Sequence, residues 1–414
     1  MNGNDIIALG LGIQEPWEIT DQILNTDKTP HELRLTLRSP RGSQYPCPVC
    51  GASCQAHDLK EMTWRHLNFF QHHCYITAPV PRVCCPEHGV KQINVPWARK
   101  GSAFTLLFEQ VAMLLVREMP VLTAARILDM VDKKLWRIIR HYVTASMAHL
   151  DISALKAFAF DETQSRKGHH YVTVFVDLDR TKRPVVFAVS GKGKDTLKAF
   201  KQHVLSRGGK AENVAEVVTD MSGSFVSGIK AYFANSTFTV DWFHVVQLLT
   251  RAVDEVRRAE SKEVALPKVS RWATLKNADG PLTEKQIDAL ADLMRMDTQT
   301  AKAWRIKEML RWVRKATSMR GAQWRLTNFI NVTLELIAGI DLLKPVRKAL
   351  TTIEKHRNAI LARWNSGHSN ARIEALNGIF QAAKRRARGY RNDETFITII
   401  YLIAAPIQNI IQSI

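Results

Sequence analysis

Short runs of alternating apolar residues fill the middle of the chain and predict the strands of a sheet. Three come first, in KAFAFDE, HYVTVFVDLD and PVVFAVSG, over residues 156–162, 170–179 and 184–191. Strand and helix patterns then alternate, with a helix over 195–205, a strand at AEVVTD (215–220), a helix over 222–233 and a strand at TFTVDWF (237–243). This order predicts an α/β fold, a mixed sheet covered by helices.

Helical periodicity precedes this sheet region. TLLFEQVAMLLV and VLTAARIL are followed by a short turn near Asp129–Asp132 and by a helix that carries Lys133, Lys134, Arg137 and Arg140. The last two helical segments predict a helix-turn-helix, whose basic second helix could enter a DNA major groove. Helical hairpins also occur as mere packing, and this turn lacks the usual Gly, so that alternative stays open.

Two further regions complete the organisation of the chain. The first hundred residues alternate over short apolar runs with many prolines, which predicts a small β-rich module. A long helical stretch begins at 245–258 and continues through stripes such as Ile306, Met309, Leu310 and Val313. We therefore expect a β module over 1–100, a helix-turn-helix over 101–150, the first part of an α/β core over 151–258, an all-helical insertion over 259–360 and the last part of that core over 361–414.

The stretch HSNARIEALNGIFQAAKRRARGY, residues 368–390, predicts a helix with two faces. Apolar residues recur at spacings of three and four, at Ile373, Leu376, Phe380, Ala383 and Ala387. A polar face roughly 120° away is formed by Glu374, Asn377, Gln381, Arg385 and Arg388. Glu374 is the single acid among five Lys/Arg in this stretch. A solvated face with an incidental acid is the simple interpretation, unless another part of the chain needs this carboxylate.

The charge of the chain narrows the class of partner. Lys and Arg number 58 against 39 Asp and Glu, a net charge of +19, which suits a polyanion such as nucleic acid rather than mere solubility. An inert charged surface is the alternative. No run approaches 18 uncharged apolar residues, and the first twenty residues lack a basic n-region, so we expect neither a membrane span nor a secretion signal. A cytoplasmic, nucleoid-associated protein is expected.

All six cysteines fall in the first fifth of the chain, where they predict a zinc site. CPVCG supplies Cys47 and Cys50, and RVCCPEHG supplies Cys85 and His88, each pair with two intervening residues. That spacing lets a tight turn place two ligands on a tetrahedral Zn²⁺. Cys84 could replace Cys85, and Cys54 and Cys74 have no assigned role; buried free cysteines are the alternative.

Two acids end predicted central strands. Asp161 closes the run Phe158–Asp161, so it shares a face with Ala159, and Asp220 closes AEVVTD. Acids there commonly face a cleft, although single ones are often strand caps. With Glu374 they make three carboxylates, the set that a pair of Mg²⁺ ions requires. Lys384, Arg385 and Arg388, further along the same helix, are then predicted to hold the DNA backbone.

Other candidate residues rank lower. Asp177 and Asp179 lead into a turn, where Asp is expected for its backbone hydrogen bonds. Asp241 and His244 could order the site, but a structural His with satisfied hydrogen bonds is the expected role. Half of the ten tryptophans lie in or beside the helical insertion, where core packing is expected and one or two could stack on an extruded base, namely Trp272, Trp304, Trp312, Trp324 and Trp364.

At this point the order Asp161, Asp220, Glu374 resembles the DDE triad of transposases with an RNase H-like fold. More closely, the chain resembles the ISL-three family of bacterial insertion-sequence transposases. The matching stretches run in the family's order through nearly the whole chain, as CPVCG, TWRHLNFF, RVCCPEHG, FAFDETQSRKGHHYVTVFVDLD, VVTDMSGSF, VDWFHVVQLLTRAVDEVRR and SNARIEALNGIFQAAKRRARGYRN. Ala375 stands where Gly is commoner in the family, and Cys84–Cys85 is doubled; neither departure touches the triad.

The resemblance implies a zinc-binding module, a helix-turn-helix and an RNase H-like core interrupted by a helical insertion. It further implies DNA cleavage at element ends and strand transfer with two Mg²⁺ ions, Mn²⁺ being an alternative. The expected partners are double-stranded DNA, as transposon ends and target, and a second copy of the chain, as a dimer in the synaptic complex. A catalytically silent DNA-binding regulator and a nuclease that cleaves without joining are the competing interpretations.

Overall fold

The computed structural model describes residues 3–368 and 371–406, and it divides into two compact units with the boundary between Ser146 and Met147. Each unit is described by itself. No helix in the described part of the chain is both long and apolar enough to cross a membrane.

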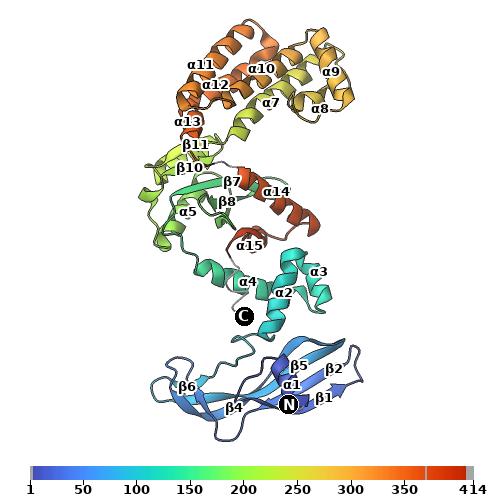
Figure 1. Ribbon diagram of the computed structural model, residues 1–414, viewed down its shortest axis with the longest axis vertical. Helices are drawn as coiled ribbons and strands as arrows, with labels where there is room; N and C mark the ends of the chain where they lie inside the picture. The colour runs from blue at the N-terminus through green and yellow to red at the C-terminus, as the bar shows by residue number, and fades with distance from the viewer. Residues whose placement is uncertain (1–2, 369–370, 407–414) are drawn as a thin grey trace. The chain divides into compact units, whose positions relative to one another are not determined.

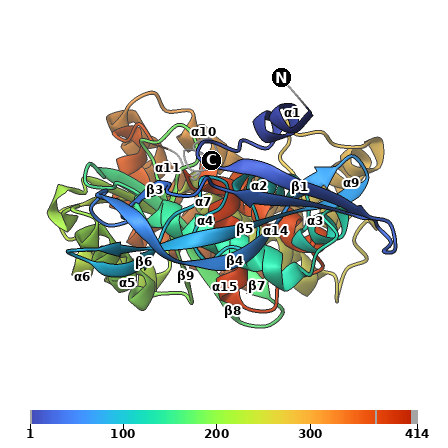
Figure 2. The same ribbon diagram turned by 90° about the horizontal axis from the view of Figure 1, so that it is seen from below.

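The N-terminal unit begins with α1 (Gly3–Gly10) and a six-stranded sheet. The strands are β1 (Glu18–Asn25), β2 (Glu32–Arg38), β3 (Gln44–Pro46), β4 (Ser53–Phe69), β5 (His72–Cys85) and β6 (Gly89–Gln92), in the order β1-β2-β5-β4-β3 with β6 beside β5. The long strands β4 and β5 run antiparallel and side by side (Figures 1 and 2). The core contains Trp17, Trp64 and Trp97, with the ring of Trp97 edge-on to the other two at 5.0 and 5.6 Å. The predicted β-rich module is confirmed.

Three helices complete this unit: α2 (Leu106–Glu118), α3 (Val121–Ile127) and α4 (Asp132–Ala148). The turn between α3 and α4 forms without Gly because Asp129 itself adopts a φ of 46°, a conformation that Asp tolerates better than most residues. Arg65 Nη1 donates to the Asp129 carbonyl at 2.6 Å, and His73 Nε2 lies 3.0 Å from its carboxylate. The sheet therefore holds the turn of the predicted helix-turn-helix in place.

The C-terminal unit is built on a five-stranded mixed sheet in the order β11-β10-β7-β8-β9. The strands are β7 (Ala157–Arg166), β8 (His170–Asp177), β9 (Val185–Ser190), β10 (Glu216–Thr219) and β11 (Thr237–Val240). β7, β8 and β9 are antiparallel neighbours, whereas β10 and β11 run parallel to β7. This confirms the predicted mixed sheet and the RNase H-like architecture.

Helices cover both faces of this sheet. On one face Phe158 and Phe160 pack against aromatic residues of α5 (Lys194–Ser206) and α6 (Gly223–Tyr232). On the other, Ala159 packs with residues of α14 (Ala371–Arg386) and α15 (Asp393–Ala404), which lie beside the sheet in Figure 1. Asp161 alternates with Phe160 and therefore belongs to the α14 face, as its spacing predicts.

An all-helical segment lies between β11 and α14, as predicted. It comprises α7 (Trp242–Glu260), α8 (Ser270–Leu275), α9 (Glu284–Arg295), α10 (Gln299–Arg314), α11 (Met319–Leu336), α12 (Lys344–Lys355) and α13 (Arg357–Leu361). Short 3-10 turns occur at η1 (Ala211–Asn213), η2 (Asp341–Leu343) and η3 (Ala362–Trp364). The buried carboxylate of Glu260, at the end of α7, accepts from the backbone N–H groups of Gln299 and Thr300 at 2.7 and 2.8 Å, which ties α7 to the start of α10.

Two predicted element bounds differ from the structure. The strand predicted over 237–243 ends at Val240, because Asp241 accepts from the N–H of Phe243 and begins α7 as its N-cap. The helix predicted over 368–390 is found as α14, from Ala371 to Arg386; residues 369 and 370 lie outside the described residues. Arg388 has a φ of 57° beyond the helix end, so its predicted place on the polar helical face is wrong.

Candidate functional site

Three aspartates, Asp161, Asp220 and Asp241, lie side by side on neighbouring strands at one edge of the C-terminal sheet. Val218 of β10 pairs with Ala159 of β7, so two residues further on Asp220 lies beside Asp161. Thr219 pairs with Val240 of β11, which places Asp241 beside Asp220 in the same way. Because β7, β10 and β11 are parallel, one edge of the sheet gathers carboxylates that lie far apart in the sequence.

The helix α14 brings Glu374 to the same place. One turn after Glu374, Asn377 Nδ2 donates to Asp161 Oδ2 at 2.8 Å. One turn further, Gln381 Nε2 donates to Thr163 Oγ1 at 2.7 Å and to the carbonyl of Gln164 at 2.9 Å. The polar face of α14 therefore lies along β7, with Glu374 at its head. The apolar residues Ile373 and Phe380 are buried in the core, as the stripe predicts.

The basic end of α14 is only partly available to a ligand. Lys384 Nζ donates to the carbonyl of Gln164, which ties that side chain to β7. Arg385 and Arg388 are exposed. The predicted DNA-binding role of these three residues stays a prediction, but Lys384 already has a structural partner.

The carboxylates at this edge share unfavourable electrostatics. Burial, followed by the neighbouring Asp241 and Asp161, raises the pKa of Glu374 to about 8. Burial also raises the pKa of Asp161, and the charges of Asp220 and Asp241 add to it. Next to Asp161, burial and the charge of Asp220 raise the pKa of Glu162 to about 7. Negative charges held this close favour either a proton or a cation between them.

The donor set of this acidic cluster fits a hard divalent cation. Glu374 Oε1 is buried and has no hydrogen-bond partner among the described residues. Both oxygens of Asp161 are oriented, one by Asn377 and the other by the N–H of Glu162 at 2.8 Å. Carboxylate oxygens are the ligands that Mg²⁺ prefers, and such an ion would offset both the burial and the repulsion that raise these pKa values.

Asp241 and His244 lie next to the acidic cluster of Asp161, Asp220 and Glu374, although the sequence favours a structural role for them. Asp241 is buried and is the first charged neighbour that raises the pKa of Glu374. His244 Nε2 stands 3.9 Å from Asp241 Oδ2 and is buried without a hydrogen-bond partner among the described residues. The expectation of a fully satisfied histidine is therefore wrong for this nitrogen. The signal in the sequence was an acid at a strand end, obscured because the strand was predicted to continue through it.

Asp177 and Asp179 lie elsewhere on the sheet. Asp177 pairs with Phe158, whereas Asp161 pairs with Val174. The carboxylates of Asp177 and Asp161 therefore lie at different positions along the strands. Asp177 accepts from the N–H of Asp179 and from Arg180 Nε, both at 3.0 Å. These are the turn-stabilising bonds that its position predicts.

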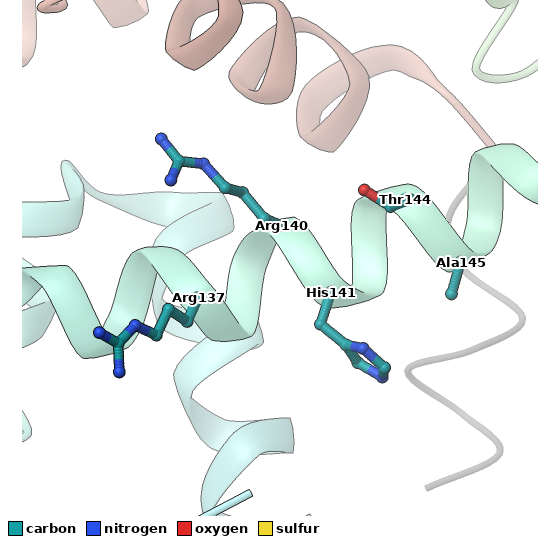
Figure 3. Close-up of a pocket in the computed structure, with 5 residues that line it drawn as sticks. All are labelled: Arg137, Arg140, His141, Thr144 and Ala145. Carbon is teal, nitrogen blue, oxygen red and sulfur yellow. The ribbon is translucent and has the colours of Figure 1, made fainter. Parts of the chain in front are cut away.

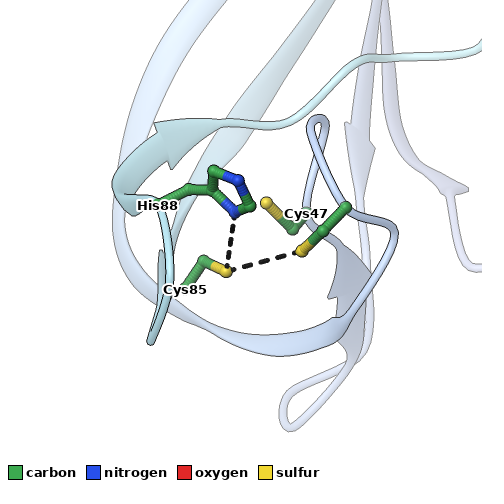
Figure 4. Close-up of side chains that lie close together, drawn as sticks. Cys47, Cys85 and His88 are labelled. Atoms are coloured by element: carbon green, nitrogen blue, oxygen red, sulfur yellow. Dashed lines mark hydrogen bonds between the residues drawn. The ribbon is translucent and has the colours of Figure 1, made fainter.

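The N-terminal unit holds a second cluster of ligand atoms. Cys47, Cys50, Cys85 and His88 offer ligand atoms that all lie within 4.8 Å of one another (Figure 4). Cys85 Sγ is 3.7 Å from Cys50 Sγ and 3.6 Å from His88 Nδ1. Ligands at about 2.3 Å around a tetrahedral zinc stand about 3.8 Å apart, so these spacings suit Zn²⁺ without rearrangement.

The other cysteines lie outside this four-ligand cluster, although the Cys54 side chain hydrogen-bonds to that of Cys85. Cys84 is exposed and points away from the position of Cys85 on the same strand, which resolves the alternative between them in favour of Cys85. Cys54 and Cys74 are buried, and burial raises the pKa of Cys74 to about 11. The N–H groups of Cys50 and then Val49 lower the pKa of Cys47, which favours the thiolate that zinc binds.

The helix α4 presents a basic surface. Its buried side carries Leu135, Ile138 and Tyr142. Its exposed side carries all four predicted cations, namely Lys133, Lys134, Arg137 and Arg140. A surface cavity of about 490 Å³ is lined by Arg137, Arg140, His141, Thr144 and Ala145 (Figure 3), where Arg137 and Arg140 leave the helix on different sides.

The insertion tryptophans divide into two groups. Trp304 and Trp364 pack against the core and donate to the carbonyls of Lys276 and Ala316, as the core interpretation predicts. Trp272, Trp312 and Trp324 are exposed, and the rings of the last two meet at 5.5 Å. Base stacking by any of them stays a prediction.

Comparisons with known proteins agree with this geometry in all three regions. The family model for transposases of the ISL3 type matches residues 158–400. A model for the helix-turn-helix domain of transposase family ISL3 matches residues 93–143, and a zinc-finger model for the transposases of IS204, IS1001, IS1096 and IS1165 matches residues 43–88, which include all four ligands of the zinc cluster. The N-terminal cluster is therefore a structural zinc site.

Curated relatives match nearly the full length. The chain is 26% identical over 369 residues to the transposase for insertion sequence element IS1001 of Bordetella parapertussis, covering 86% of this chain and 88% of that protein. It is 26% identical over 437 residues to the transposase for insertion sequence element IS1557 of Mycobacterium tuberculosis, covering 95% of this chain and 94% of that protein. Since the transposase model spans more than half of the sequence, the chain belongs to the ISL3 family of transposases.

Proposed function

We propose that the chain cuts DNA at the ends of an insertion sequence and joins the 3′-OH to target DNA, with Asp161, Asp220 and Glu374 as ligands of two divalent cations, Mg²⁺ in the first place and Mn²⁺ as an alternative. The observation that carries this proposal is the acidic edge of the sheet. Its carboxylates gather from the ends of β7 and β10 and from α14, the pKa values of Asp161 and Glu374 are raised, and Glu374 Oε1 is buried without a donor among the described residues.

The residues around these carboxylates have positioning roles in the proposal. When bound, the two cations would lower the pKa of the attacking water or 3′-OH and stabilise the leaving oxygen of a phosphodiester. Asn377 and the N–H of Glu162 hold the two oxygens of Asp161 in fixed directions. Gln381 keeps α14 against β7, so that Glu374 stays beside Asp161.

Recognition of DNA is assigned to the N-terminal unit. The exposed cations of α4 would contact phosphates and base edges of the terminal repeat, and the zinc site would hold the sheet on which the helix-turn-helix turn is docked. Arg385 and Arg388 would bind the backbone of the DNA near the acidic cluster. A dimer in the synaptic complex is part of the proposal, since cleavage of two ends in one event needs two active sites.

The test compares cleavage with binding on labelled end DNA. Asp161→Asn, Asp220→Asn and Glu374→Gln should each lose cleavage and strand transfer by about a thousandfold or more, because removing a metal ligand removes the chemistry it supports. Gel-shift binding to the same DNA should remain. Asp177→Asn is the matched control, a buried acid of the same sheet that should retain activity. Normal cutting by Glu374→Gln would refute the triad, and a wild-type protein that binds ends but never cuts would indicate the silent regulator.

A further inference from the structure

A histidine links three elements just before the helix that carries Glu374. His368 Nδ1 lies 2.9 Å from Glu216 Oε2, and His368 Nε2 lies 3.2 Å from Asp179 Oδ1. Glu216 is the first residue of β10, the strand that leads to Asp220, and Asp179 lies in the turn between β8 and β9. The imidazole of His368 therefore joins the segment before α14 to two parts of the sheet.

This arrangement needs a proton on both ring nitrogens. A neutral imidazole has one N–H donor and one lone pair, so it can satisfy only one of two carboxylates. The imidazolium has two donors and carries the charge that both acids attract. Burial opposes that charge, but the hydrogen bonds and charges of Glu216 and Asp179 outweigh it and raise the pKa of His368.

The other charged groups near His368 already have partners. Arg372, on α14, donates to the carbonyls of Arg180 and Thr181 in the β8–β9 turn. Arg180 donates to Asp177 and to the carbonyl of Asp151. Glu216 Oε1 accepts from Thr239 Oγ1 at 2.7 Å, and the Ser366 side chain also hydrogen-bonds to the Glu216 carboxylate. Glu216 and Asp179 are thus the acids that the imidazole faces.

Solvent can reach this cluster. A cavity of about 420 Å³ is lined by Glu216, Thr237, Thr239 and Ser366 among others. The His368 side chain itself is 27% exposed and that of Asp179 is 53% exposed. His368 can therefore exchange its proton without unfolding of the unit.

We propose that His368 is a proton-dependent positioning residue, whose imidazolium ties the start of α14 to Glu216 and Asp179 and thereby holds Glu374 at the acidic edge of the sheet, beside Asp161 and Asp241. The link to Glu216 fixes the helix relative to the strand that ends at Asp220, and Arg372 provides a second tie that does not depend on a proton. When the imidazolium loses a proton, one ring nitrogen becomes a lone pair. The hydrogen bond from that nitrogen to its carboxylate, either Glu216 or Asp179, is then lost. The sign follows from the raised pKa: the tie is complete below the ordinary pKa of histidine and is lost as the pH rises through that of His368.

The first experiment measures the contacts of His368 with Glu216 and Asp179 and does not depend on DNA cleavage. NMR titration of histidine-labelled full-length protein, with the His368 signal assigned by its loss in His368→Gln, should give a pKa above that of the exposed His149. Asp179→Asn should lower it. In parallel, hydrogen exchange of the 371–380 backbone should speed up in wild type as the pH rises through that value, after correction for intrinsic exchange, and should show no such step in His368→Gln. A His368 pKa at or below that of His149 overturns the proposal.

The second experiment uses a variant that removes the need for the proton. In Glu216→Gln the amide can donate to a neutral Nδ1 while Nε2–H donates to Asp179, so both hydrogen bonds persist at every pH. This second experiment rests on the proposed function, because its readout is cleavage of end DNA. His368→Gln should cut about tenfold more slowly than wild type at pH 6, the scale of one charge-assisted hydrogen bond, and the difference should disappear as the pH rises above the pKa measured for His368. Glu216→Gln should show no such pH step.

Controls separate the possible failures. Arg372→Gln should slow cleavage by the same factor at every pH, and His149→Gln should change nothing. Equal pH profiles for wild type, His368→Gln and Glu216→Gln would overturn the positioning role even if His368 titrates high. If wild type does not cleave at all, the proposed function fails, while the titration and the hydrogen exchange still decide whether the tie exists.

Discussion

The zinc cluster and the acidic cluster of this chain are assembled in opposite ways. The zinc ligands come as two pairs, Cys47 with Cys50 and Cys85 with His88, each carried by a tight turn of one small sheet. The acidic cluster draws Asp161, Asp220, Asp241 and Glu374 from three strands and a helix, with an all-helical segment inserted between the last two. The first site can form wherever its turns form, whereas the second exists only when the whole C-terminal unit is folded.

The two clusters also differ in what they contribute to stability. In the zinc cluster, backbone N–H groups lower the pKa of Cys47, whereas at Cys50 the lowering by the N–H of Ala52 is outweighed by desolvation and by the thiols of Cys85 and Cys47, which raise the pKa. At the acidic edge, burial and like charges raise the pKa of Glu374 and Asp161. We infer that the zinc site stabilises its unit, whereas the acidic cluster is held together by the fold against repulsion. Without a cation, Asp161 and Glu374 therefore retain protons at a pH where unfolded carboxylates would lose them.

Loss of zinc should give the largest effect. Cys85→Ser removes one of four ligands, and a structural zinc contributes on the order of 10 kcal/mol in small zinc domains, so the N-terminal unit should lose its cooperative unfolding transition. Because that unit docks the turn at Asp129, end-specific DNA binding should be lost with the metal. Elemental analysis, calorimetry and a gel shift on the same sample measure all three.

The neighbouring cysteine provides the control for that experiment. Cys84→Ser changes the adjacent residue, which is exposed and outside the cluster, and should retain about one zinc per chain, as four ligands imply. Equal zinc content in Cys84→Ser and Cys85→Ser would show that the ligand set is wrong.

The same contrast explains which parts of the molecule were predictable from the sequence. Cys47, Cys50 and His88 follow from spacing alone, because two intervening residues fix the geometry of a turn. Asp161 and Asp220 follow from alternation, since each closes an apolar run. The importance of Asp241 does not follow, because whether a strand stops before an acid or continues through it depends on the N-cap bond to Phe243, a contact of the folded chain. The contacts of Lys384 with Gln164 and of His368 with Glu216 join residues far apart in sequence, and no local pattern encodes them.

DNA binding should change by a smaller amount when one exposed cation of the N-terminal unit is removed. Arg137→Ala should weaken binding to end DNA by roughly three- to tenfold and reduce the slope of log K against log salt by about one, because one phosphate contact releases about one counterion. Lys60→Ala is the matched control, an exposed cation on β4 of the same unit. Fluorescence anisotropy between low and physiological salt measures both quantities. An affinity that does not vary with salt would exclude phosphate contacts as the basis of binding.

The smallest expected effect is a pH-dependent change in stability at the acidic cluster, and it tests the difference between the two clusters directly. Glu374 has a pKa of about 8 in the folded chain against an ordinary value of 4.5, so the folded state binds a proton that the unfolded state has already lost. The stability of the metal-free C-terminal unit should therefore fall as the pH rises from about 5 through 8. Asp241→Asn removes the neighbouring charge that raises this pKa, and Asn is as good an N-cap as Asp, so the start of α7 is preserved. The variant should melt higher than wild type at pH 8.5, by a few degrees, and should differ little at pH 5.5.

Thermal melts across that range should use protein treated with a chelating resin rather than a soluble chelator, so that the zinc site keeps its ion. The raised pKa of His368 also makes stability fall as the pH rises, but it acts in both proteins, so the difference between them isolates Asp241. Asp288→Asn is the control, an exposed acid on α9 whose loss removes the same charge without relieving the cluster. If Asp241→Asn and Asp288→Asn shift the melting temperature alike at every pH, the carboxylates do not repel one another, and the distinction between a stabilising zinc site and a strained acidic site fails.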